Sequence, residues 1–134
     1  MFSHKIEVRF SDFDSMGHVN NAIFLTYLEI ARINYIQQVM KENNLDHRKF
    51  GFILAHVSID YKKPIECQFI IATIWVSKIG NSSFEFSYKL TDENETIYAN
   101  ATSIQVCYDY KGKIKVPIPD ELKILLEKEK ITTS

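Results

Sequence analysis

The segment from residue 22 to residue 40 constrains the fold of this chain more than any other segment. Its apolar side chains have the spacing of a helix, and they lie around most of the helical circumference rather than along one stripe. They are Ile23, Phe24, Leu25, Tyr27, Leu28, Ile30, Ala31, Ile33, Tyr35, Ile36 and Val39. Other elements must cover a helix with so little polar surface. The sequence therefore predicts a central helix that the rest of the chain surrounds.

Strand patterns occur on both sides of this helix in the sequence. Apolar and polar residues alternate over residues 5–11, and further strand patterns follow at 52–61, 69–76, 83–90 and 97–108, with polar turns between them. Residues 117–130 have the pattern of a short final helix. Consecutive strands joined by short turns pair antiparallel. We therefore expect an α+β fold in which a curved antiparallel sheet wraps the long helix.

Composition narrows the class of protein. The chain has 134 residues, of which 46% are hydrophobic and 25% charged, and this balance indicates one globular domain covering residues 1–134. A net charge of -1 argues against binding to nucleic acid or to an anionic membrane. The first ten residues lack the pattern of a signal peptide, so we expect a cytoplasmic protein. Cys67 and Cys107 have the spacing of neither a zinc site nor a disulfide framework, which predicts two buried free thiols.

Residues 9–21 carry the chemistry. They read Arg-Phe-Ser-Asp-Phe-Asp-Ser-Met-Gly-His-Val-Asn-Asn and stand between the first predicted strand and the long helix. The start of a helix offers unpaired backbone N–H groups and a partial positive charge, which suit the oxyanion that forms when an acyl carbonyl is attacked. A carboxylate a few residues upstream can activate water as a general base. It can also attack a thioester as a nucleophile, because thiolate is a good leaving group.

This segment resembles the core motif of the 4-hydroxybenzoyl-CoA thioesterase-like branch of the hotdog-fold acyl thioesterases. The motif is Arg-aromatic-x-Asp-x-Asp-x-x-Gly-His-Val-Asn-Asn, followed on the helix by Tyr27, Glu29, Ala31 and Arg32. Segments 59–64, 79–84 and 116–119 are similar to the second strand, the central hairpin and the final turn of that family, in the expected order. The resemblance thus covers essentially the whole chain.

The resemblance implies a hotdog fold, in which a five-stranded antiparallel sheet wraps the long central helix and a short helix ends the chain. It also implies a thioester hydrolase without a cofactor, assembled as a homodimer or homotetramer with active sites between protomers. By position, Asp14 matches the catalytic aspartate of the family, and the backbone N–H of Asn21 matches the oxyanion donor. Supporting or substrate-binding positions in the same segment are Asp12, Gly17, His18 and Asn20.

Two further segments bear on the acyl group and its carrier. Residues 18–21 resemble a variant shared with fatty acyl-carrier-protein thioesterases and long-chain acyl-CoA thioesterases, which favours an aliphatic acyl chain. Members that act on aromatic thioesters place paired arginines in the hairpin that meets the CoA nucleotide, whereas this chain offers only Lys78 there. Lys62 and Lys63 can take over this role at a neighbouring strand end. Alternatively, the acyl donor is an acyl carrier protein, which has no nucleotide.

Simpler roles compete with the functional ones. For Asp12, a structural role as a turn-forming side chain that binds nearby backbone has the same weight as a supporting role in the site. For His18, orienting the loop has the same weight as a catalytic role. Asn20 or Asn21 can cap the helix while the same helix start binds a ligand. Phe24, one turn into the helix, suits the core or a contact with the acyl group. No third ligand stands at a spacing typical of a metal site, so we expect no bound metal.

Two functions of different classes fit these residues. The first is an acyl-CoA or acyl-carrier-protein thioesterase that produces a free carboxylic acid and a thiol. The second is a non-catalytic module of the same fold that binds acyl thioesters or supports an assembly, because a fold does not determine a function. A hotdog hydratase ranks below both, since the aspartate-to-histidine arrangement expected of that group is not visible in this sequence.

Overall fold

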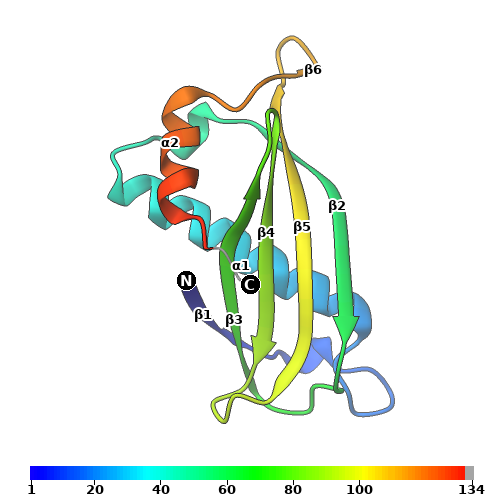
Figure 1. Cartoon of the computed structure of the whole chain (residues 1–134). Helices are drawn as coiled ribbons and strands as arrows, with labels where there is room; N and C mark the ends of the chain where they lie inside the picture. The colour runs from blue at the N-terminus through cyan, green and yellow to red at the C-terminus, as the bar shows by residue number, and fades with distance from the viewer. Residues whose placement is uncertain (132–134) are drawn as a thin grey trace.

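The long helix predicted from the sequence is α1 (Asn21–Glu42), and it lies across one face of a curled antiparallel sheet (Figure 1). This computed structural model describes residues 1–131. A second helix, α2 (Asp120–Glu129), packs near the far end of α1 (Figure 1). No helix in the described part of the chain is long and apolar enough to cross a membrane.

The sheet has the predicted antiparallel pairing but a different strand order from that of the chain. Its strands lie side by side in the order β1 (Phe2–Glu7), β3 (Phe69–Ile79), β4 (Ser83–Thr91), β5 (Ile97–Asp109) and β2 (Phe52–Tyr61). A two-residue strand, β6 (Ile114–Lys115), pairs with β5 and makes the sheet six-stranded rather than five-stranded. The expected pairing of β2 with β3 is wrong. β2 pairs with β5, and the chain then crosses past β5 and β4 to form β3.

The first strand differs most from its prediction. It ends at Glu7 rather than continuing to residue 11, and Phe10–Asp12 form a short 3-10 helix, η1. The cause is the Asp12 carboxylate, which accepts a hydrogen bond from the Arg9 backbone N–H at 2.9 Å and so turns the chain. Phe10, expected on the buried face of a strand, is instead 96% exposed.

The core lies between α1 and the central strands. From α1 it contains Phe24, Tyr27, Leu28, Ala31, Tyr35 and Met40. They meet buried residues at every second position of β3 and β4, such as Ile74 and Phe86. Each fully buried side chain of this size contributes about 1.5–3 kcal/mol of hydrophobic free energy. This packing fixes the direction of α1, and therefore where the helix begins.

One side of α1 is not covered, contrary to the expectation of a surrounded helix. Leu25 and Ile33 are 42% and 46% exposed, and Glu29 between them is also exposed. These positions lie four residues apart and therefore on one side of the helix. An open groove of about 150 Å³ separates this side from β2, and Leu54 and Val57 line its opposite wall. The sheet therefore wraps α1 only in part.

The two ends of the sheet carry different segments (Figure 1). At one end lie the start of α1, the loop before it and the connection between β2 and β3. At the other end lie β6, the β3–β4 turn and the 3-10 helix η2 (His47–Lys49) before β2. β2 runs from the second end to the first. The candidate site predicted from the sequence therefore lies at the first end.

Candidate active site

The segment before α1 forms a closed loop. Phe13 and Val19 form an isolated antiparallel bridge, and the Asn20 N–H donates to the Asp12 carbonyl at 2.9 Å. Gly17 has a φ of 80°, a left-handed conformation that glycine adopts without steric cost. The role predicted for Gly17 thus has a backbone explanation, because a side chain at this position would strain the turn.

Asp14 lies within this loop with its side chain exposed. Its Oδ1 accepts hydrogen bonds from the backbone N–H of Met16 at 2.8 Å and of His18 at 3.4 Å. Its own N–H donates to the His18 carbonyl at 2.8 Å. No hydrogen bond to Oδ2 arises within residues 1–131. The loop therefore holds the Asp14 carboxylate through one oxygen and leaves the other available.

The start of α1 follows directly. Of the two asparagines predicted as caps, Asn20 caps the helix, because its side chain accepts a hydrogen bond from the Ala22 N–H at 2.9 Å. The Asn21 N–H has no acceptor in the described part of the chain. Tyr61, at the end of β2, donates from its hydroxyl to the Asn21 carbonyl at 3.0 Å. An unpaired N–H on the first turn of a long helix is suited to an oxyanion.

Phe24 and Tyr61 pack against each other edge to face, with ring centroids 4.9 Å apart. Phe24 is only 1% exposed, which favours the core role over a direct contact with an acyl group. Tyr61 is 43% exposed. Sequence reasoning missed Tyr61, because its contact with the helix start joins segments far apart in the chain.

Asp12 has a structural role in this loop. It is 1% exposed, and its carboxylate accepts hydrogen bonds from the Arg9 backbone, the Arg9 guanidinium and the Tyr27 hydroxyl at 2.9–3.2 Å. Burial raises the pKa of Asp12, but the hydrogen bonds from Arg9 and Tyr27 outweigh it and hold the pKa below its ordinary value. Both oxygens are occupied, so Asp12 joins the loop to α1 and leaves Asp14 as the carboxylate open to a substrate.

His18 contacts Glu66, which the sequence analysis did not identify as a site residue. Its Nε2 lies 3.0 Å from Oε1 of Glu66, which belongs to the connection between β2 and β3. The imidazole is 39% exposed. No local spacing links positions 18 and 66, so only the folded chain brings this pair together. The site therefore contains a second carboxylate beside its histidine.

The three predicted carrier-binding lysines do not lie together. Lys62 and Lys63 follow Tyr61 at the first end of the sheet, and their backbone N–H groups donate to the Tyr98 carbonyl. Lys78 lies near the end of β3, nine residues beyond Phe69. At a rise of roughly 3.4 Å per residue, this places Lys78 about 30 Å from the Asp14 end. Within one chain, only Lys62 and Lys63 are near the candidate site.

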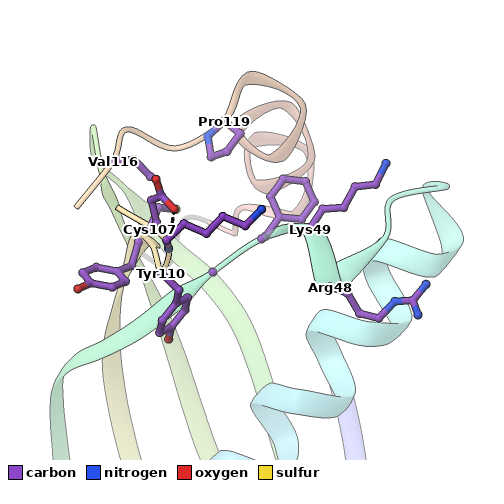
Figure 2. Close-up of a pocket in the computed structure, with 11 residues that line it drawn as sticks. Arg48, Lys49, Cys107, Tyr110, Val116 and Pro119 are labelled. Atoms are coloured by element: carbon purple, nitrogen blue, oxygen red, sulfur yellow. Dashed lines mark hydrogen bonds between the residues drawn. The ribbon is translucent and has the colours of Figure 1, made fainter. Parts of the chain in front are cut away.

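A separate hollow lies at the opposite end of the sheet. It measures about 520 Å³ and is lined by Arg48, Lys49, Tyr110 and Lys111 among others. Figure 2 shows the Arg48 and Lys49 side chains extending away from Tyr110 rather than converging on the hollow. Arg48 is also paired with Asp46, with Nε and Oδ1 3.0 Å apart. This hollow is remote from Asp14 and does not belong to the candidate site.

Cysteine and metal-binding groups do not add to the site. Both cysteines are free; Cys107 is buried as predicted, whereas Cys67 is only partly buried. Burial raises the pKa of the Cys107 thiol to about 11, which keeps it protonated at neutral pH. Residues 1–131 contain no group of three or more His, Cys, Asp or Glu side chains placed to hold a metal ion. The candidate site therefore consists of Asp14, His18, Glu66 and the start of α1.

Comparison with known proteins places these features in a family. The model of the Thioesterase-like superfamily matches residues 8–126. A 1,4-dihydroxy-2-naphthoyl-CoA hydrolase from Nostoc punctiforme is 28% identical, over 94% of this chain and 86% of the relative. The long-chain acyl-CoA thioesterase FadM from Escherichia coli is 27% identical, over 92% of this chain and 95% of the relative.

A solved structure agrees with this assignment. A thioesterase from Thermus thermophilus, in complex with coenzyme A and Zn, matches with a TM-score of 0.78 and 28% identity, over 94% of this chain and 91% of that one. The hotdog fold predicted from the sequence is confirmed, as is a thioester hydrolase at the level of the family. Because the family model spans most of the sequence, the chain belongs to the Thioesterase-like superfamily.

Proposed function

We propose that this protein is an acyl-CoA thioesterase in which Asp14 is the catalytic carboxylate. The observation that carries the proposal is the closed loop before α1. Among residues 1–131, this loop holds Asp14 only through Oδ1, and it ends at the Asn21 N–H, which has no acceptor there. A base or nucleophile and an oxyanion donor thus belong to one rigid unit. The names of the relatives, which act on CoA thioesters, support CoA as the carrier.

Two routes through Asp14 give the same products. As a general base, Oδ2 takes a proton from water, the water oxygen bonds to the acyl carbonyl carbon, and the C–S bond breaks. As a nucleophile, Oδ2 bonds to that carbon first, and water then hydrolyses the resulting anhydride. In both routes the carbonyl oxygen becomes an oxyanion, which the Asn21 N–H and the positive end of α1 stabilise. The thiolate leaves and takes up a proton.

The surroundings of Asp14 suit an apolar acyl group on a charged carrier. Phe10 and Met16 flank Asp14 in the sequence and are 96% and 77% exposed, so this end offers apolar surface. Lys62 and Lys63 supply positive charge for the phosphates of CoA. An acyl carrier protein remains the alternative donor. The relatives are named for a naphthoyl and a long-chain acyl group, and both kinds belong in the first substrate panel.

The active unit that we propose is a homodimer of hotdog domains, or a homotetramer built from such dimers. Each domain would comprise residues 1–134, of which 132–134 lie outside the described residues. β2 is an edge strand, and the exposed Leu25 and Ile33 of α1 lie beyond it. A second copy that paired with β2 would cover this side of α1. If the two β2 strands were antiparallel, Lys78 of each copy would come toward the Asp14 end of the other.

The test is thiol release from a panel of acyl-CoAs and acyl carrier proteins, with the wild type and Asp14→Asn compared under identical conditions. The substitution keeps the shape of the side chain but removes the base. We expect the wild type to hydrolyse at least one thioester, and the variant to lose on the order of a hundredfold or more in kcat. Asp109→Asn is the matched control, because Asp109 is exposed at the opposite end of the sheet.

Circular dichroism would show whether Asp14→Asn remains folded. Undiminished activity in the folded variant would exclude Asp14 as the catalytic group. Tight binding of acyl thioesters without turnover by either protein would instead support the non-catalytic binding module.

A further inference from the structure

Glu66 is an acidic residue of the site to which the proposed mechanism gives no role. It lies in the connection between β2 and β3, and its Oε1 is 3.0 Å from Nε2 of His18. The two residues are distant in the sequence and belong to different segments of the fold. The folded chain therefore brings them together, and no local turn accounts for the contact.

Buried neighbours fix the position of this pair. The Val19 N–H donates to the Ile65 carbonyl at 2.9 Å, which joins the residue after His18 to the residue before Glu66. Val19 and Ile65 are 2% and 0% exposed. Most surface ion pairs must order two long side chains from independent segments. Here the core already holds both backbones at the required separation.

The contact between His18 and Glu66 contributes little to the stability of the folded chain. The side chains of His18 and Glu66 are 39% and 68% exposed, and exposed ion pairs contribute only about 0–1 kcal/mol. His18 is, however, bound on both sides of its backbone to Asp14: its carbonyl accepts from the Asp14 N–H, and its N–H donates to Asp14 Oδ1. Any constraint on the His18 ring therefore acts next to the proposed catalytic carboxylate.

The contact places the Nε2 side of the His18 ring against the Glu66 carboxylate, 3.0 Å from Oε1. An ionised carboxylate only accepts hydrogen bonds, so it favours a proton on the nitrogen that faces it, which is Nε2. A neutral imidazole with its proton on Nε2 has an acceptor at Nδ1.

We propose that Glu66 is a positioning residue, which fixes the ring of His18 and keeps its proton on Nε2. The Nδ1 atom is then free to accept a hydrogen bond from the water that Asp14 activates. This inference rests on the proposed thioesterase function.

The experiment compares Glu66→Ala, Glu66→Gln and the exposed control Glu127→Ala, using a thioester that the wild type hydrolyses. Removing the acceptor in Glu66→Ala should lower kcat on the order of tenfold and change KM little, because substrate contacts remain. Glu66→Gln keeps an oxygen that can accept from Nε2 and should restore most of the rate. Glu127→Ala should behave as the wild type. Urea unfolding of all variants should agree within about 1 kcal/mol.

A second measurement reads the histidine directly. Long-range ¹H–¹⁵N correlation spectra at neutral pH distinguish the two tautomers, with His18 assigned from the loss of its signals in His18→Asn. We expect the Nε2-protonated form in the wild type and a mixture in Glu66→Ala. An unchanged tautomer in Glu66→Ala, or a kcat within about twofold of the wild type, would overturn the inference. If the wild type hydrolyses no thioester, the proposed function fails, and the spectra then decide alone whether Glu66 sets the His18 tautomer.

Discussion

At the scale of single residues, the two aspartates of the loop have opposite environments although only Phe13 separates them. Asp12 is buried and its two oxygens are bound by Arg9 and Tyr27. Asp14 is exposed and bound through one oxygen to backbone N–H groups. A carboxylate whose oxygens are both occupied contributes to folding, whereas one with a free oxygen can react. This difference supports a structural role for Asp12 and the catalytic role that we propose for Asp14.

The environment of Asp12 predicts a loss of stability in acid. Its pKa is lower in the folded chain than in the unfolded chain, so the unfolded chain binds the proton more readily. The stabilisation is therefore present above the ordinary aspartate pKa of about 4 and disappears as the pH falls through the lower folded value. We expect the free energy of unfolding of the wild type to fall over this range, as measured by urea unfolding at a series of pH values.

Asp12→Asn isolates this contribution. At neutral pH the variant should be less stable by about 1–3 kcal/mol, because the charge-assisted hydrogen bonds from Arg9 and Tyr27 weaken. Its stability should also change less between neutral and acid pH than that of the wild type. The same slope in Asp12→Asn and in the exposed control Asp109→Asn would contradict the assignment.

At the scale of elements, the connection between β2 and β3 determines how the site is assembled. It crosses the end of the sheet where α1 begins, and Ile65 anchors it in the core with no exposed surface. The Ile65 carbonyl binds the Val19 N–H, and the Gln68 carbonyl binds the Val8 N–H at 2.8 Å. These two hydrogen bonds tie the connection to the loop before α1 and to the residue that follows β1. Glu66 reaches His18 only because this crossing is fixed.

Ile65 should therefore be important for stability. We expect Ile65→Ala to lower the free energy of unfolding by about 2–5 kcal/mol, because it leaves a cavity in a well-packed region. Ile97→Ala, at a position that is 43% exposed, should cost much less. Urea unfolding of both variants provides the comparison. Equal losses would mean that the connection is not anchored through the Ile65 side chain.

Local sequence patterns predict some parts of this fold but not others. The strand predicted at 52–61 has the observed bounds of β2, because apolar periodicity is a property of neighbouring residues. The pairing of β2 with β5 could not be predicted in this way, since it depends on contacts between distant segments. The site divides likewise. The motif around Asp14 lies in one segment and was found, whereas Glu66 and Tyr61 join it through the fold and were missed.

At the scale of the whole molecule, the candidate carrier-binding lysines lie at opposite ends of the sheet. Asp14, Lys62 and Lys63 are at the end where α1 begins, and Lys78 is near the other end of the sheet. β2 runs between these two ends (Figure 1). The unpaired edge of β2 and the exposed side of α1 lie along this same path. A twofold pairing of β2 strands would cover both surfaces and bring opposite ends together, so one interface accounts for all three observations.

Leu54 on β2 tests this assembly. It is 44% exposed and lines the groove opposite Leu25, so a second copy over this groove would bury it. We expect the wild type to be a dimer or tetramer in light scattering coupled to size-exclusion chromatography, and Leu54→Lys to shift toward the monomer, because burying an unpaired charge is costly. Ile124→Lys is the control, since Ile124 is 71% exposed on α2, away from the groove.

If each active site needs both copies, thiol release by Leu54→Lys should recover as its concentration is raised. A monomeric wild type with full activity would refute the shared site and leave Lys62 and Lys63 as the carrier-binding residues.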